Sequence, residues 1–287
     1  NIFDYFGATV TSAGVASNGG CNAWSITNNR FYQTGTRTWT TGALHNAINI
    51  GNSTATSGAQ GFTITGNIVG YASNTQTGTY TLTGSTGTFR GIVFNGITGG
   101  TVSNINNNTV AAVSLTGVTS SGTSSSAPFM GIYVTTGVAI TNNNTIGSQS
   151  ATDSLSYATN SASAADVMGM FNFSLDGWTA NNNNIGGITS ANGGAGAANA
   201  YGIRLNTSSS VTTTLTGNNV GGTVANSIQS TSTAAGTQVA GIFVSTSIAT
   251  ATSNTVRNLS AAGGTGTTTA ASVVGIDFIS STPVNTA

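Results

Sequence analysis

Apolar residues recur along this chain in short alternating runs, with small polar residues between them. Ile132 and Val134 flank Tyr133, for example, and the same alternation returns in the segment 136–140. A period of two is typical of β-strands that bury one face. No segment shows the 3.6-residue apolar stripe and capping residues of an amphipathic helix. The pattern therefore predicts an all-β protein built from short strands.

Two phrases repeat over the whole chain and keep step with each other. An Asn-x-apolar phrase recurs with separations of 38, 41, 36, 39, 35 and 36 residues. It begins at Asn29, Asn67, Asn108, Asn144, Asn183, Asn218 and Asn254. A Gly-(Ile/Met) phrase begins at Gly91, Gly131, Gly169, Gly202, Gly241 and Gly275. A fixed period of this size indicates a repeat protein in which each unit stacks on the next.

The repeat predicts a parallel β-solenoid of about seven rungs, because such short strands need neighbours above and below for stability. Each repeat reads as three strands followed by a loop rich in Ser, Thr, Gly and Ala. We expect loops of this kind at 119–127, 148–165, 190–200 and 261–271. We treat residues 1–287 as one domain and expect it to be a segment of a longer chain.

The asparagine of each Asn-x-apolar phrase is expected to form an internal ladder along the solenoid. Asparagine tolerates the left-handed backbone of sharp bends, and its amide both donates and accepts hydrogen bonds in a stack of identical turns. The alternative is that these asparagines are exposed turn residues, which the amino acid also favours.

Composition excludes several classes of function. The chain has 287 residues, of which 3% are charged against about 25% in ordinary domains. Its charged groups are five arginines and five aspartates, so there is no basic patch for nucleic acid. No apolar run approaches the ~18 residues of a membrane-spanning helix. A disordered Ser/Thr/Gly linker is the other interpretation, but the 38% hydrophobic content and the fixed period argue against it.

With both phrases in place, the chain resembles the right-handed parallel β-helix repeats of very large secreted surface proteins of Gram-negative bacteria. The resemblance extends from about Trp24 to Val284 and rests on Gly-Ile-x-Val, a Val-x-Ile strand and Asn-Asn-Thr-Ile-Gly. It implies a pectate-lyase-like superfold and an extracellular or cell-surface location. Enzymes, phage tailspikes, adhesins and filaments all use this superfold, so the fold assigns no activity.

No catalytic, metal or cofactor site stands out among the residues. The aspartates are dispersed, and an enzyme would need Asp153, Asp166 and Asp176 to meet in space. Asp277 shares a column with Arg204, which we interpret as a long-range surface pair. His45 lies in no recognisable Ser or Cys motif, and the single Cys21 excludes an intrachain disulfide. We expect no catalytic residues, no metal and no cofactor.

Two further features concern the surface. The residue after each Gly-Ile should face outward, yet it is apolar at Val93, Tyr133, Phe171 and Phe243. This stripe is either covered by loops or a contact surface. Ser154, in Asp153-Ser154-Leu155, resembles a short O-glycosylation signal of some of these bacteria.

The sequence thus favours a non-enzymatic structural or adhesive solenoid that forms a rod, filament or sheath element on a bacterial surface. Its expected partners are copies of itself or neighbouring repeats, with a glycan or cell-surface ligand as a further option. Nucleic acid and membrane insertion are not expected. The alternatives are a β-helix that binds or cleaves polysaccharide, and an ice-binding solenoid that uses threonine pairs such as Thr63 with Thr65, Thr214 with Thr216 and Thr250 with Thr252.

Overall fold

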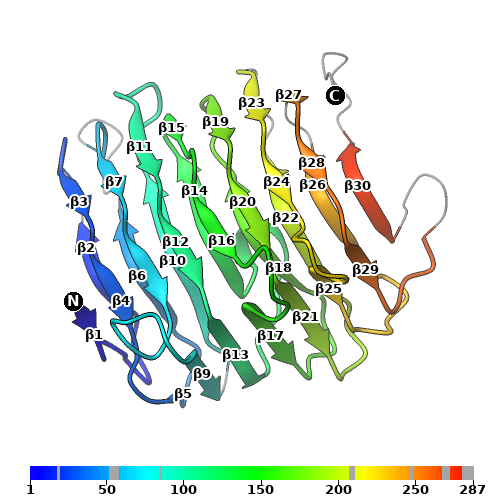
Figure 1. The fold of residues 1–287 in the computed structure, drawn as a ribbon. Coiled ribbons are helices and arrows are strands. Elements are labelled where there is room, and N and C mark those ends of the chain that lie inside the picture. The colour runs from blue at the N-terminus through cyan, green and yellow to red at the C-terminus, as the bar shows by residue number, and fades with distance from the viewer. Residues whose placement is uncertain are drawn as a thin grey trace.

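A computed structural model shows the chain as a parallel β-helix in which strands of successive rungs lie side by side (Figure 1). It describes residues 1–17, 20–51, 58–84, 86–206, 211–245, 248–266 and 272–279. In these ranges two sheets contain eight strands and two contain seven, and every pairing is parallel between consecutive rungs. The predicted all-β solenoid of about seven rungs is confirmed.

Four strands, one in each sheet, make up a complete rung. Sheet 1 contains β1 (Ile2–Phe3), β4 (Arg30–Tyr32), β8 (Ile68–Gly70), β12 (Thr109–Ala111), β16 (Thr145–Gly147), β20 (Asn184–Gly186), β24 (Asn219–Val220) and β28 (Thr255–Val256). Sheet 2 contains β2 (Ser12–Ser17), β6 (Leu44–Ile50), β10 (Thr88–Asn95), β14 (Phe129–Thr136), β18 (Ala165–Asn172), β22 (Ala198–Asn206), β26 (Val239–Ser245) and β30 (Val273–Phe278).

The strands of the two remaining sheets are shorter than most strands of sheet 2. Sheet 3 contains β3 (Ser25–Thr27), β7 (Thr63–Thr65), β11 (Ser103–Asn106), β15 (Ala139–Ile140), β19 (Trp178–Asn181), β23 (Thr213–Thr216) and β27 (Ala249–Thr252). Sheet 4 contains β5 (Arg37–Trp39), β9 (Tyr80–Gly84), β13 (Val113–Val118), β17 (Leu155–Thr159), β21 (Ile188–Asn192), β25 (Ile228–Ser230) and β29 (Leu259–Ala261). One 3-10 helix, η1 (Ser124–Ser126), lies between β13 and β14.

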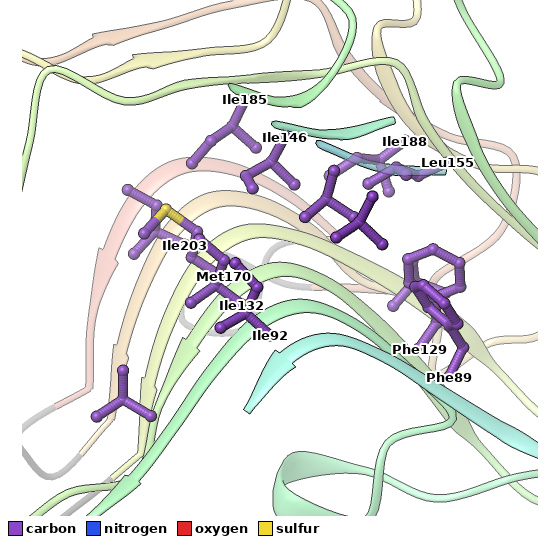
Figure 2. Close-up of a cluster of buried hydrophobic side chains, with 14 of the residues drawn as sticks. Phe89, Ile92, Phe129, Ile132, Ile146, Leu155, Met170, Ile185, Ile188 and Ile203 are labelled. Carbon is purple, nitrogen blue, oxygen red and sulfur yellow. The ribbon is translucent and has the colours of Figure 1, made fainter. Parts of the chain in front are cut away.

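The core is a set of apolar columns in which like residues stack from rung to rung. Ile92 pairs with Ile132, and Ile132 pairs with Met170, all without exposed surface. The same stacking joins Ile146 to Ile185 in sheet 1 (Figure 2). Because each side chain packs against its counterparts one rung away, the columns merge into one hydrophobic core along the helix.

The glycines of the Gly-(Ile/Met) phrase, except Gly275 in β30, lie where neighbouring rungs approach closely. A Cβ built on Gly131 would lie 2.5 Å from the carbonyl oxygen of Gly169 and 2.8 Å from Cγ2 of Ile146. Gly169 meets Gly202 and Ile185 in the same way. At these positions glycine is required, because any side chain would separate the rungs.

The expectation of three strands per repeat is wrong, because sheet 4 is a fourth strand layer. The segment 148–165, expected to be a loop, contains β17, and the segment 190–200 contains the end of β21 and the start of β22. In β17, Leu155 and Tyr157 point inward, whereas the small residues Ser156 and Ala158 face out. The segment was predicted to be a loop because it is rich in Ser, Thr and Ala, and this composition concealed the alternation. The segment 261–271 lies partly outside the described residues.

Candidate functional site

The seven phrase asparagines lie above one another just before the strands of sheet 1 and are linked by hydrogen bonds. Each of the first six donates twice to Oδ1 of the next, from its backbone N–H at 2.8–3.0 Å and from Nδ2 at 2.9–3.2 Å. The series runs unbroken from Asn29 to Asn254. We call it the inner ladder.

The inner ladder is buried and also holds the strands of sheet 3. The five middle members are at most 1% exposed, whereas Asn29 and Asn254 are half-buried. Nδ2 of Asn144, for example, donates to the carbonyl of Ile105 at 2.8 Å, one rung back. Both amide hydrogens and the amide oxygen of the middle members are thereby satisfied within the protein, as buried polar groups require.

The expected left-handed backbone belongs to the residue before each ladder asparagine and not to the ladder residue itself. Asn107, Asn143 and Asn182 have φ of 58°, 57° and 56°. Glycine fills this position before Asn67 and Asn218, and Ser253 adopts a φ of 55° before Asn254. The left-handed residue turns the chain, which leaves the ladder asparagine free to point inward.

A second, outer ladder was missed by the sequence reasoning. Oδ1 of Asn106 accepts from the backbone N–H of Asn142, Oδ1 of Asn142 accepts from Asn181, and Oδ1 of Asn181 accepts from Thr216, at 2.8–3.0 Å. The signal was present in the asparagine runs 106–108, 142–144 and 181–183. In each run the first residue serves the outer ladder, the second turns the chain and the third serves the inner ladder.

The apolar stripe on the outer face of sheet 2 is largely covered. Tyr133 is 9% exposed, Phe171 0% and Phe243 7%, whereas Val93 is half-buried. They belong to an outer aromatic cluster, completed by residues of the neighbouring column and of the segment 119–127. Its buried members are Ala127, Met130, Tyr133, Met168, Phe171, Tyr201, Ala240 and Phe243. The stripe could be covered by loops or exposed as a contact surface, and most of it is covered.

The strand that carries Phe171 keeps the side-chain alternation of the neighbouring rung. The register of β14 and β18 continues without a shift, so Asn172 points into the core with 0% exposure. Its Nδ2 has no hydrogen-bond partner among the described residues, and its Oδ1 accepts from the backbone of Ser174. Phe173 beyond it is 42% exposed.

The segment 119–127 is held over this face by a buried ion pair. Asp166 pairs with Arg204 and accepts hydrogen bonds from Nδ2 of Asn199 and the backbone N–H of Ser124, both at 2.8 Å. Arg204 also lies 4.6 Å from the ring centroid of Tyr201. The expected surface pair of Arg204 with Asp277 is wrong. Phe243 lies between the two residues in the column, and the guanidinium of Arg204 forms its ion pair with Asp166.

The other acids also have separate structural partners. Asp176 accepts from the backbone N–H groups of Gly99 and Gly137 at 3.0 and 2.9 Å, which joins three rungs. Asp153 is exposed and accepts from Thr152. Asp153, Asp166 and Asp176 are not brought together. In the described part of the chain, no three His, Cys, Asp or Glu side chains are grouped as metal ligands.

His45 lies in a buried polar cluster at the N-terminal end of the helix. Its Nδ1 is 2.7 Å from Oγ of Ser12, its Nε2 contacts the hydroxyl of Tyr80, and that hydroxyl reaches Tyr5 at 3.0 Å. The sequence did not indicate Ser12 as a partner of His45, because the two residues lie on neighbouring rungs, 33 positions apart in the chain. Burial lowers the pKa of His45 from 6.5 to about 3, so the imidazole is a weak base at neutral pH. The cluster fits a structural role better than nucleophilic catalysis.

The threonine pairs of sheet 3 do not form one continuous array. Thr179, Thr214 and Thr250 pair in register, but Asn104 and Ile140 occupy the same column nearer the N-terminus. Ser103 and Thr141, the hydroxyl residues of the rungs between these pairs, are fully buried. Ser154, the residue that resembles an O-glycosylation site, is half-buried. Its Oγ accepts a hydrogen bond from the backbone N–H of Ala112 at 3.2 Å.

A hollow lies on the outer face of sheet 2, next to the aromatic cluster. It has a volume of about 210 Å³. Its lining includes Asn46, Asn49, Arg90, Val93, Ser125 and Tyr133. We call it the Arg90 hollow. It forms because small side chains replace the aromatic residues in the first rungs.

Comparison with known proteins gives no assignment, since no family model, curated protein or solved structure matches the chain. Among the residues that the structure describes, no helix has the length and apolar character needed to cross a membrane.

Proposed function

We propose that this chain is a non-enzymatic structural or adhesive segment, of the right-handed β-helix type, that acts as a rigid rod on a bacterial surface. It would lie outside the cell as part of an adhesin, sheath or filament. The observation that carries the proposal is the unbroken inner ladder from Asn29 to Asn254. In successive rungs a buried or half-buried asparagine side chain is hydrogen-bonded to the asparagine of the next rung. These links favour stiffness along the helix axis.

The distribution of charge supports the same function. Two of the five aspartates form ion pairs with arginine, and Asp176 binds backbone N–H groups. With 3% charged residues the surface has little charge repulsion, so contact between copies or with neighbouring repeats costs little free energy. We propose such contacts as the way in which rods would combine.

Immunogold electron microscopy of the source cells tests this function, with an antibody raised against the purified chain. We expect label on extended material outside the cell. Label confined to the cell interior would contradict the proposal.

An assay on neutral and acidic polysaccharides tests the enzymatic alternative. We expect no release of products. Turnover that is lost in Asp277→Asn, a variant outside the buried ion pair, would indicate an enzyme instead.

A further inference from the structure

The Arg90 hollow contains a buried cation without an anion. Arg90 is 5% exposed, and its guanidinium makes one hydrogen bond among the described residues, from Nη1 to the carbonyl of Phe89 at 3.1 Å. All five aspartates lie in the described ranges, and the only ion pairs found there are Arg37 with Asp4 and Arg204 with Asp166. A buried charge without a partner is unfavourable, so this arginine needs an explanation.

Arg204, on the same face of the same sheet, shows how the protein satisfies such a group elsewhere. Its carboxylate partner is Asp166, and two aromatic rings lie near its Cζ, with the centroid of Tyr201 at 4.6 Å and that of Phe243 at 5.2 Å. Arg90 has only the Tyr133 ring, 5.9 Å from its Cζ to the centroid, and the hollow in place of a carboxylate. Arg90 thus lacks the carboxylate that Arg204 has, and a ligand could supply that group.

The hollow also offers acceptor and donor groups beside the guanidinium. Asn46, next to Arg90 in register, is 2% exposed, and its Oδ1 has no hydrogen-bond partner among the described residues. Asn49 and Ser125 line the same space and are more exposed. An unsatisfied buried acceptor favours a ligand hydroxyl, because leaving the oxygen unpaired costs free energy.

The shape of the hollow follows from two outward columns of sheet 2. From β2 to β18, the first column consists of Ala13, Asn46, Arg90, Met130 and Met168. The second column consists of Ala16, Asn49, Val93, Tyr133 and Phe171. Apart from Arg90 itself, the residues of these two columns in β2, β6 and β10 are smaller than those in β14 and β18. The cover provided by the segment 119–127 reaches the hollow only at Ser125, so the space stays open to solvent there.

We propose that the Arg90 hollow binds a small carboxylate that carries hydroxyl groups, either a free hydroxy acid or an acidic sugar. The planar guanidinium would bind the carboxylate, Oδ1 of Asn46 would accept from a hydroxyl group, and Tyr133 and Val93 would contact the body of the ligand. One cation matches one negative charge, which favours a carboxylate over a dianionic phosphate. A volume of about 210 Å³ equals roughly seven water volumes, enough for one sugar ring.

Arg90 keeps its charge for this role. Burial lowers the pKa of its guanidinium to about 10, which still leaves it protonated at neutral pH. The site is independent of the proposed rod function, since the inner ladder lies at sheet 1 and the hollow on the outer face of sheet 2.

NMR titration of the ¹⁵N-labelled chain tests the site, because five arginines give only five side-chain Nε–Hε signals. The probes are sodium D-glucuronate, sodium lactate, a glucuronate-containing oligosaccharide and D-glucose as the uncharged control. We expect saturable shifts of the Arg90 signal with a Kd of roughly 1 mM for at least one carboxylate. Preference for glucuronate or its oligosaccharide would identify an acidic sugar, and equal binding of lactate would identify a free hydroxy acid.

Variants separate the site from general effects of charge. Arg90→Gln should weaken binding at least tenfold, whereas Arg257→Gln, which removes the same charge from an exposed position, should leave it unchanged. Val93→Phe keeps Arg90 but fills the hollow with the residue found at Phe171 and Phe243 in the same column. It should also abolish binding. No saturable shift with any carboxylate, equal binding of glucose, or unchanged binding by Val93→Phe would overturn the proposal.

Discussion

Asn108 and Asn144 lie one rung apart and are joined twice. Oδ1 of Asn144 accepts from the backbone N–H of Asn108 at 2.9 Å and from its Nδ2 at 3.1 Å. Both residues are at most 1% exposed. The link therefore belongs to the interior of the helix, where an orphaned polar group costs about 1–3 kcal/mol.

Removing a middle member of the inner ladder should destabilise the protein more than removing its first member. Asn144→Ala would leave the backbone N–H of Asn108 and the carbonyl of Ile105 without partners, so we expect a loss of about 3 kcal/mol in unfolding free energy. Asn29→Ala, at a half-buried position, should cost about 1 kcal/mol. Urea denaturation measures both, and equal losses would contradict a cooperative ladder.

The glycine column should be intolerant of alanine where another rung packs on it. A Cβ on Gly169 would lie 2.6 Å from the carbonyl oxygen of Gly202, so Gly169→Ala should cost about 1–3 kcal/mol. Gly275 is the matched control, because the nearest atom to its Cβ is 3.9 Å away. Gly275→Ala should leave the thermal midpoint nearly unchanged. A similar midpoint for the two variants would show that the close approach does not limit stability.

Stability should fall in mild acid because of His45. Its folded pKa of about 3 lies below its ordinary value of 6.5, so the unfolded chain binds the additional proton between these pH values. The contribution is complete above pH 6.5 and is lost as the pH falls toward 3. His45→Phe, which copies Phe89 in the next rung, should reduce this slope in urea titrations at several pH values. An unchanged slope would mean that the imidazole does not titrate as its burial requires.

The ion pair that holds the segment 119–127 should matter more than an exposed aspartate. Asp166→Asn removes the carboxylate from Arg204, whose side chain is 12% exposed, and should cost about 3 kcal/mol. Asp153→Asn, at an exposed position, should have no measurable effect on unfolding. Limited proteolysis provides a second measurement, in which only Asp166→Asn should expose the segment near Ser124. Equal resistance of both variants to urea and protease would contradict the role assigned to Asp166.

The period and the apolar columns could be predicted from the sequence because each rung solves the same packing problem. A residue such as Ile132 needs a counterpart one rung away, and that requirement appears as a fixed spacing. The fourth strand was missed because Leu155 and Tyr157 are surrounded by small polar residues that are equally common in loops. Strand pairing with the adjacent rungs, which the local composition does not encode, decides the structure there.

The contacts outside the repeated columns could not be predicted in the same way. Ser12 meets His45 because β2 and β6 are neighbours, and neither residue belongs to the repeated phrases. Arg90 also lies outside the repeated phrases. Its isolation becomes visible only when the partner of Arg204 is known and the small side chains beneath it are placed in register.

Hydrogen exchange of asparagine side-chain amides, followed by NMR, tests the central claim most directly. The NH₂ groups of Asn67, Asn108, Asn144, Asn183 and Asn218 should exchange slowly and together, because opening any of them requires separation of rungs. The half-buried Asn29 should exchange faster. Rapid exchange of all these groups, at the rate of exposed asparagines, would contradict a continuous buried ladder and the rigid rod that depends on it.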